Sequence, residues 1–234
     1  MFPASIQNLI TQLSKLPEIG PKAATRLVFY LLNQEQKELS ELSELVKNLK
    51  TSIHLCPRCF NLAESNQLLC SICQDPKRDK TTICVVEEIL DIIPLEKTKQ
   101  YSGLYHVLAG LISPLDGIGP EQLKIKELVE RIKKSNVILN PPPLFNKSGG
   151  GVKNPVAVDK STGSFTGVQD DNKIREIILA LNPTTEGDTT ILYLERLIKP
   201  LNIKITRLAR GLSTGADLEY ADANTLTSAL LGRK

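Results

Sequence analysis

Cys56-Pro57-Arg58-Cys59 and Cys70-Ser71-Ile72-Cys73 form two Cys-x-x-Cys pairs, one on each side of residues 60–69. Each pair presents two thiolates from one short turn, and four thiolates suit the tetrahedral geometry that zinc prefers. Because no coordination position stays open for a substrate, we predict a structural zinc site with Cys56, Cys59, Cys70 and Cys73 as its ligands. Two disulfides are the alternative interpretation of this pattern.

The start of the chain bears on that choice. Residues 1–20 lack a basic start, an apolar core and a small-residue cleavage site, so we expect no signal peptide and a cytoplasmic location. Thiols stay reduced in that compartment, which favours zinc over disulfides. The longest apolar runs are too short to cross a bilayer, so we expect no membrane association.

Composition sets further bounds on function. The chain has 234 residues, 41% of them hydrophobic, which is enough for a core divided among two or three modules. A formal net charge of +3 neither requires nor excludes nucleic acid, so any contact with DNA must come from local basic patches. With no Trp, five Tyr and five Phe, a single-strand binder built on base stacking is disfavoured. Contact with the phosphate backbone is the favoured mode.

Residues 1–50 have helical periodicity. Apolar residues recur at spacings of three and four on two faces, the first formed by Ile6, Ile10 and Leu13, and the second by Leu27, Leu31 and Leu32. Between these faces, Pro17 is expected to end the first helix and Gly20 to allow a sharp turn. Pro21 is expected to begin the next helix.

The start of that second helix has the features of a phosphate site. Backbone N–H groups of residues 19–23 are expected to point outward, with Lys22 and Arg26 one helical turn apart beside them. This predicts a DNA-binding site of Gly20, Lys22 and Arg26 that holds the DNA backbone without reading bases. An ordinary helical hairpin with a solvated lysine and arginine fits the same spacing.

After the cysteines, β-branched runs alternate with helical periodicity. This alternation predicts a mostly parallel sheet covered by helices. The expected strands are residues 82–86, 105–108, 177–181 and 204–208, and the expected helices are residues 123–134, 189–199 and 223–231.

Carboxylates follow two of these strands. Glu87 and Glu88 come directly after the first, while Glu186 and Asp188 follow the third. Sites in α/β proteins usually lie at the carboxyl ends of parallel strands, so Glu87, Glu186 and Asp188 form a candidate acidic site. Capping of the following helix, or pairing with a lysine, explains Glu87 and Glu88 equally well.

Residues from about 140 to 171 interrupt this pattern with three consecutive prolines, three consecutive glycines and little periodicity. So long a stretch without regular structure is expected to be a mobile insertion. Gly149-Gly150-Gly151 does not stand in the order G-x-x-x-x-G-K-[ST], so a nucleoside triphosphatase of the P-loop type is rejected.

The order of these motifs resembles the RecR family of bacterial recombination mediators over almost the whole chain. The stretches that carry the resemblance are Leu16 to Ala24, the four cysteines, Ile83 to Glu87, Tyr105 to Leu108, Ser113 to Pro120, Asn182-Pro183-Thr184 with Glu186-Gly187, Ala209-Arg210-Gly211 and Asp217 to Asp222. Each could arise elsewhere, whereas together they are specific. The segment 140–171 is longer than expected for the family.

The resemblance implies an α+β multidomain fold. We expect a helix-hairpin-helix DNA-binding domain over residues 1–54, a zinc finger over 55–80, a Toprim domain with a mostly parallel sheet over 81–199, and a C-terminal strand-helix segment over 200–234. It also implies a homo-oligomer, from a dimer to a tetrameric ring, that clamps DNA in recombinational repair. RecO and RecF are the implied partners in promoting RecA loading at gaps.

Toprim enzymes use a glutamate after one strand and a D-x-D after another to hold magnesium. Glu87 fits the first position, but Asn182-Pro183-Thr184 stands at the second and lacks both carboxylates. Glu186 and Asp188 would recruit magnesium only weakly. We therefore predict a non-catalytic Toprim domain, with a metal-dependent nuclease or nucleotidyl transferase as the alternative.

Overall fold

The structure is a computed structural model that describes residues 2–136, 173–209, 211–212, 215 and 223–231. The predicted insertion at about 140–171 and Arg210 lie outside the described residues. Contacts divide the chain into two units, the first formed by Met1–His54 with Glu64–Asn66 and the second by Leu55–Ala63 with Gln67–Lys234. No described helix is long and apolar enough to span a membrane.

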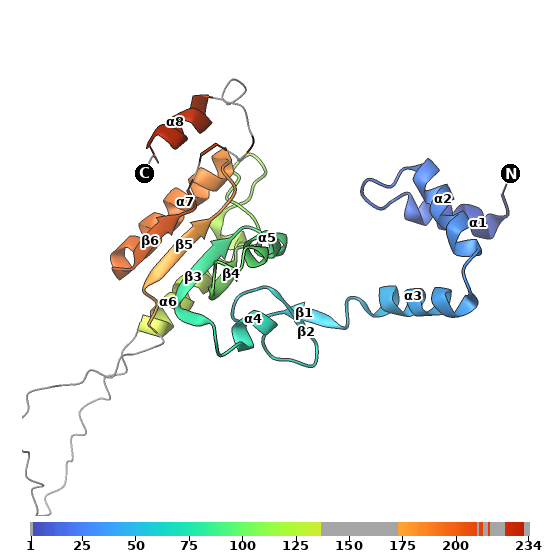
Figure 1. Ribbon diagram of the computed structural model, residues 1–234, viewed down its shortest axis with the longest axis horizontal. Helices are drawn as coiled ribbons and strands as arrows, with labels where there is room; N and C mark the ends of the chain where they lie inside the picture. The colour runs from blue at the N-terminus through green and yellow to red at the C-terminus, as the bar shows by residue number, and fades with distance from the viewer. Residues whose placement is uncertain (1, 137–172, 210, 213–214, 216–222, 232–234) are drawn as a thin grey trace, which may run out of the picture. The chain divides into compact units, whose positions relative to one another are not determined.

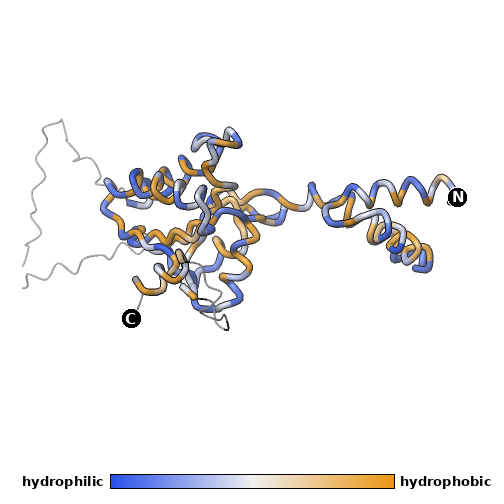
Figure 2. The backbone as a smooth tube through the Cα atoms, turned by 90° about the horizontal axis from the view of Figure 1, so that it is seen from above, coloured by the Kyte–Doolittle hydropathy of each residue, from blue (hydrophilic) through white to orange (hydrophobic). Residues whose placement is uncertain are grey.

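The first unit holds three helices, α1 (Ala4–Leu13), α2 (Pro21–Leu32) and α3 (Gln36–Asn48). Figure 2 shows hydrophobic and hydrophilic residues alternating along these helices, as amphipathic helices require. The buried contact joins Ile10 of α1 to Ala24 and Val28 of α2. Leu27, Leu31 and Leu32 lie on α2 as predicted, but Leu27 and Leu32 are exposed, and Ala24 and Val28 are the buried residues of this helix.

The turn between α1 and α2 also differs from the prediction. Helix α1 ends at Leu13, before Pro17 is reached. The residue with a left-handed backbone is Glu18, at φ 64°, whereas Gly20 has φ −78° and is the N-cap of α2. Pro21 begins α2 as predicted, since its missing N–H would be unpaired in the first turn anyway.

The cysteine region forms a small module. Two short strands, β1 (Ile53–Leu55) and β2 (Leu62–Glu64), pair with each other, and a single helical turn, α4 (Ser71–Gln74), follows. These elements are too short to have been predicted from periodicity. They bring the two Cys-x-x-Cys turns together around a core made almost entirely of cysteines.

The second unit is built on a four-stranded sheet in the order β4-β3-β5-β6, with every neighbouring pair parallel. The strands are β3 (Asp79–Val86), β4 (Gly103–Val107), β5 (Glu176–Ala180) and β6 (Lys204–Arg207). The predicted parallel sheet is therefore confirmed. Strand β3 starts three residues earlier than expected, because Thr81 and Thr82 donate hydrogen bonds to Asp79 and extend the ordered backbone.

Figure 1 shows strands β4, β3, β5 and β6 side by side in this sheet, and buried side chains pack on both of its faces. On one face Ile83 and Val85 pack with residues of α6 (Ile125–Asn136) and α7 (Thr185–Ile198). On the other face Cys84 and Val86 pack with Ile92 of α5 (Ile92–Lys97). The remaining elements are three 3-10 turns and a helix, namely η1 (Ile89–Asp91), η2 (Pro120–Gln122), η3 (Lys199–Leu201) and α8 (Ala223–Leu231).

Helix α7 begins at Thr185, earlier than the predicted start at residue 189. Thr184 is its N-cap, and the Thr184 hydroxyl accepts a hydrogen bond from the Gly187 N–H over 3.0 Å. The early start places Glu186 and Asp188 in the first turn of a helix instead of a loop. Carboxylates in that position are stabilised by the helix dipole without any metal.

Candidate functional site

The four predicted zinc ligands come together in one buried cluster. The sulfur atoms of Cys56, Cys59, Cys70 and Cys73 all lie within 4.8 Å of one another, and the Sγ atoms of Cys59 and Cys70 are 3.4 Å apart. A disulfide needs about 2.05 Å between its sulfurs, so the four thiols are free. Four Zn–S bonds of about 2.3 Å in a tetrahedron place sulfurs about 3.8 Å apart. The donors and spacing therefore fit structural zinc, and no disulfide is formed.

Local turns aim these thiols inward. The backbone N–H of Cys56 donates to the carbonyl of Asn61 over 2.7 Å, and Phe60 in the same turn has a left-handed φ of 62°. Hydrogen bonding from the thiols of Cys59 and Cys73 lowers the pKa of Cys70. The hydrogen bond with Cys70 raises the pKa of Cys59 in return, so without a metal the cluster favours one shared thiolate, and zinc has to displace the remaining thiol protons.

Within the second unit, backbone and side-chain hydrogen bonds join this module to the parallel sheet. The backbone N–H of Val107, on β4, donates to the carbonyl of Cys59 over 2.9 Å. Just after the module, the Arg78 guanidinium pairs with both carboxylate oxygens of Glu96, and it donates to the carbonyl of Gly103 over 3.2 Å. The Tyr105 hydroxyl donates to the same Glu96 carboxylate over 2.7 Å. Arg78 gave no signal in the sequence, because its partners lie on other elements.

The candidate acidic site has a different geometry from a metal centre. Asn182 Nδ2 donates to Glu87 Oε2 over 2.7 Å, so the amide lies where a second metal-binding carboxylate would be needed. In the described part of the chain, the four cysteines are the one group of three or more His, Cys, Asp and Glu side chains close enough to share a metal ion. Glu87, Glu186 and Asp188 do not form such a group.

Glu88 has a structural role. Its backbone N–H donates to the Asp91 carboxylate over 2.8 Å, in the capping arrangement at the start of η1. The helix-capping interpretation is therefore confirmed for Glu88. Glu87, by contrast, turns toward Asn182.

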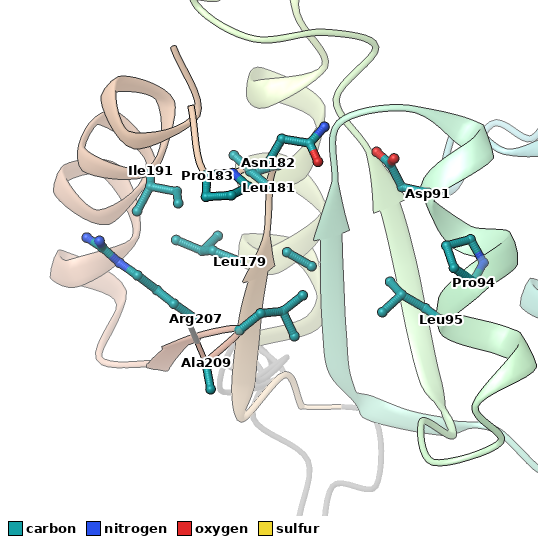
Figure 3. A pocket seen from close by; sticks show the side chains of 12 residues that line it. Asp91, Pro94, Leu95, Leu179, Leu181, Asn182, Pro183, Ile191, Arg207 and Ala209 are labelled. Carbon is teal, nitrogen blue, oxygen red and sulfur yellow. The ribbon is translucent and has the colours of Figure 1, made fainter. Parts of the chain in front are cut away.

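A cavity of about 300 Å³ lies beside this edge of the sheet. Figure 3 shows Asp91 and Asn182 at its upper rim and Arg207 across from Leu95, with Leu179 and Leu181 between them. Arg207 donates from Nε and Nη2 to the Glu195 carboxylate, over 2.9 and 2.7 Å. Arg207 is thus paired with an acid on α7.

The predicted DNA site lies on the first unit. Lys22 and Arg26 are both exposed on α2, and a Cβ at Gly20 would meet nothing within 4 Å. The backbone N–H of Ile19 donates to the Leu16 carbonyl, and Pro21 has no backbone N–H. The N–H groups of Lys22 and Ala23 are therefore the donors in the first turn of α2 that have no partner within the helix. The surface at this helix start is open.

Two further residues of the sheet are buried. Cys84 lies in the middle of β3. His106 is fully buried and its Nε2 lies 2.8 Å from the Lys124 carbonyl, but its Nδ1 has no hydrogen-bond partner in the described structure. One ring nitrogen of His106 is thus hydrogen-bonded and the other is not.

Comparison with known proteins agrees with this architecture along the whole chain. The family model of the RecR helix-hairpin-helix matches residues 6–49, and that of the RecR four-cysteine zinc finger matches residues 53–75. The Toprim domain model matches residues 81–209, and the RecR C-terminal model matches residues 211–234. Recombination protein RecR of Acidothermus cellulolyticus is 42% identical over all of this chain and 98% of its own length. The chain belongs to the RecR family. RecR of Chloroherpeton thalassium is 41% identical over 98% of this chain and 96% of its own. RecR of Lactobacillus acidophilus is 42% identical over 99% of this chain and 98% of its own length.

Proposed function

We propose that this RecR-family chain is a DNA-binding recombination mediator in recombinational repair. It clamps DNA as a homo-oligomer and works with RecO and RecF to promote RecA loading at gaps. The observation that supports DNA binding most directly is the open start of α2, where Gly20 leaves space beside the cations of Lys22 and Arg26.

The physical basis is electrostatic. Unpaired N–H groups and the positive end of the helix dipole at the start of α2 favour an anion. Lys22 and Arg26 stand four residues apart and add charge on the same side of the helix. A phosphate can be held there without any base being read, so binding is independent of sequence and weakens with salt.

The oligomer is supported by apolar residues on the surface of α3. This helix is amphipathic, yet none of its residues is buried within the described chain. Leu42 and Val46 are 46% and 67% exposed, and Leu49 follows them on the same face. An uncovered apolar stripe of this kind marks an interaction surface, which a second copy of the chain would cover.

The hydrogen bond from Asn182 to Glu87 supports a scaffold role for the Toprim domain over the nuclease alternative. A carboxylate engaged by an amide offers magnesium one anionic ligand where phosphoryl transfer needs a cluster. The mediator is therefore proposed to act without chemistry of its own.

Retention of DNA by the double variant Lys22→Ala/Arg26→Ala tests this function. We expect it to lose most of the retention seen with the wild-type protein while its thermal unfolding is unchanged. Lys37→Ala/Lys47→Ala is the matched control, because it removes the same charge from exposed positions of the same unit. Equal retention by both double variants would contradict the proposal, as would wild-type protein that binds DNA only together with RecO. Magnesium-dependent cleavage lost in Glu87→Gln would favour the nuclease.

A further inference from the structure

Arg131 is a partly buried cation, with a buried guanidinium nitrogen, whose side chain reaches from the Toprim domain to the cysteine module. It lies on α6, and its Nη1 donates to the Tyr105 carbonyl over 2.7 Å and to the Arg58 carbonyl over 3.2 Å. Tyr105 belongs to β4 of the sheet, and Arg58 lies between the first two cysteines. One guanidinium nitrogen thus joins the backbones of the two modules.

The positive charge of Arg131 has no carboxylate partner among the residues that the structure describes. Nη2 is buried and lacks any hydrogen-bond acceptor. The neighbouring acid on the same helix face, Glu127, is paired with Lys124 over 3.1 Å. A buried guanidinium nitrogen without an acceptor is unfavourable, so a negative charge close to it would stabilise the native protein.

The cysteine sulfurs are in the right place to supply that charge. Burial lowers the pKa of the Arg131 guanidinium, as does the nearby Arg58 cation, whereas the sulfurs of Cys73, Cys59 and Cys56 raise it. Four neutral thiols carry no charge, whereas four thiolates around one Zn²⁺ carry a net charge of −2. Loading of zinc therefore creates, next to the guanidinium, the anion that it otherwise lacks.

We propose that Arg131 is the counter-cation of the zinc–tetrathiolate centre, so that zinc binding and the docking of the cysteine module on the Toprim sheet are coupled through this one side chain. Arg131 is a positioning residue, because it contacts the ligand-bearing turn and not the metal. Its cation stabilises the thiolates, and the thiolates stabilise it in return. The proposal rests on the zinc centre and is independent of DNA binding.

Release of zinc to a chromogenic chelator, measured on the full chain, tests the proposal. Arg131→Gln removes the charge but keeps amide donors for the two carbonyls, Arg131→Met removes both, and Arg131→Lys keeps the charge. Outer partners of zinc ligands typically contribute about 10-fold or more to metal affinity, so the Gln and Met variants are expected to bind zinc about 10-fold more weakly. Arg131→Lys should stay closer to wild type. Lys133→Gln, an exposed cation of the same helix, is the control and should not change zinc binding.

Cobalt in place of zinc gives a readout that a purely structural role would not move. A nearby cation lowers the energy of the thiolate electrons, so the thiolate-to-cobalt charge-transfer band of Arg131→Gln is expected at longer wavelength than that of wild type. Wild-type zinc affinity and an unshifted band in Arg131→Gln would overturn the proposal. Equal loss of zinc from Arg131→Lys and Arg131→Gln would do the same. If the neutral variants do not fold, Arg131→Lys decides, because it must then fold and hold zinc.

Discussion

The side-chain amide of Asn182 donates a hydrogen bond to a carboxylate oxygen of Glu87 over 2.7 Å. The two residues follow neighbouring parallel strands, β3 and β5, and so meet at one edge of the sheet. A Toprim enzyme would hold a metal ion between carboxylates at this edge. Here a direct hydrogen bond joins Asn182 and Glu87 at that edge instead.

Asn182→Asp should reverse this relationship. Two carboxylates would then face each other, and the lost charge-assisted hydrogen bond would reduce the free energy of unfolding by about 1–2 kcal/mol in the absence of divalent cations. Excess magnesium should restore the lost stability, since Mg²⁺ can bridge the two carboxylates. Thermal unfolding with and without magnesium measures this. Asn182→Ala removes the donor without adding charge, and a magnesium response of equal size in that variant would refute the explanation.

Arg78→Met tests the ion pair between Arg78, which follows the cysteine module, and Glu96. The Arg78 side chain is 15% exposed and pairs with Glu96, so its removal should cost about 2 kcal/mol of unfolding free energy in urea denaturation. Lys77→Met, the exposed neighbour, should cost much less. The Arg78 guanidinium also lowers the pKa of Glu96. A carboxyl whose pKa is lowered by folding stabilises the folded protein above its unfolded pKa, and this contribution is lost as the pH falls through the folded pKa. The free energies of unfolding of wild type and Arg78→Met should therefore converge in acid.

His106 predicts a loss of stability in mildly acidic solution. Burial lowers its pKa to about 4, whereas an unfolded histidine titrates near about 6.5. The unfolded chain therefore binds the proton first, and stability falls as the pH drops from about 6.5 toward about 4, by about 1.4 kcal/mol per unit. Urea denaturation at about pH 7 and about pH 5.5, with zinc in excess, gives the slope.

His106→Gln should have a shallower slope than wild type over that window, since Gln can still donate to the Lys124 carbonyl but cannot be protonated. His54→Gln removes the other histidine of the chain and serves as the control. Identical slopes for His106→Gln and wild type would show that His106 is not the titrating group.

Leu42→Glu/Val46→Glu tests the exposed stripe of α3. Charges at these two positions should prevent a second copy from covering the stripe, so the mass in light scattering should fall. Helix content should remain, because neither residue is buried in the described chain. Glu41→Gln/Glu44→Gln, on the same helix, is the control. An unchanged mass in the Leu42/Val46 variant would place the subunit contact elsewhere.

Much of the fold could be predicted from local patterns. The zinc ligands were predictable because two Cys-x-x-Cys turns fix chemistry and spacing together. The parallel sheet followed from the alternation of β-branched runs, such as residues 82–86, with segments of helical periodicity. Pro21 was a correct signal for the start of α2 because its effect is confined to one residue.

The remaining features depend on tertiary contacts that leave no local pattern. Ala24 was not predicted as a core residue because a small side chain becomes buried only when α1 packs closely against it. The pair of Arg78 with Glu96 and the reach of Arg131 to Arg58 join elements far apart in sequence. The sharp turn before α2 was assigned to Gly20, whereas Glu18 takes the left-handed conformation.

The salt dependence of DNA affinity tests the central claim most directly. Each phosphate contact contributes about 0.9 to the slope of log affinity against log salt concentration. If Lys22 and Arg26 each hold a phosphate, the slope of Lys22→Ala/Arg26→Ala should be smaller than that of wild type by about 2 per subunit engaged, and Lys37→Ala/Lys47→Ala should match wild type. An unchanged slope in Lys22→Ala/Arg26→Ala would contradict the claim that the start of α2 binds the DNA backbone.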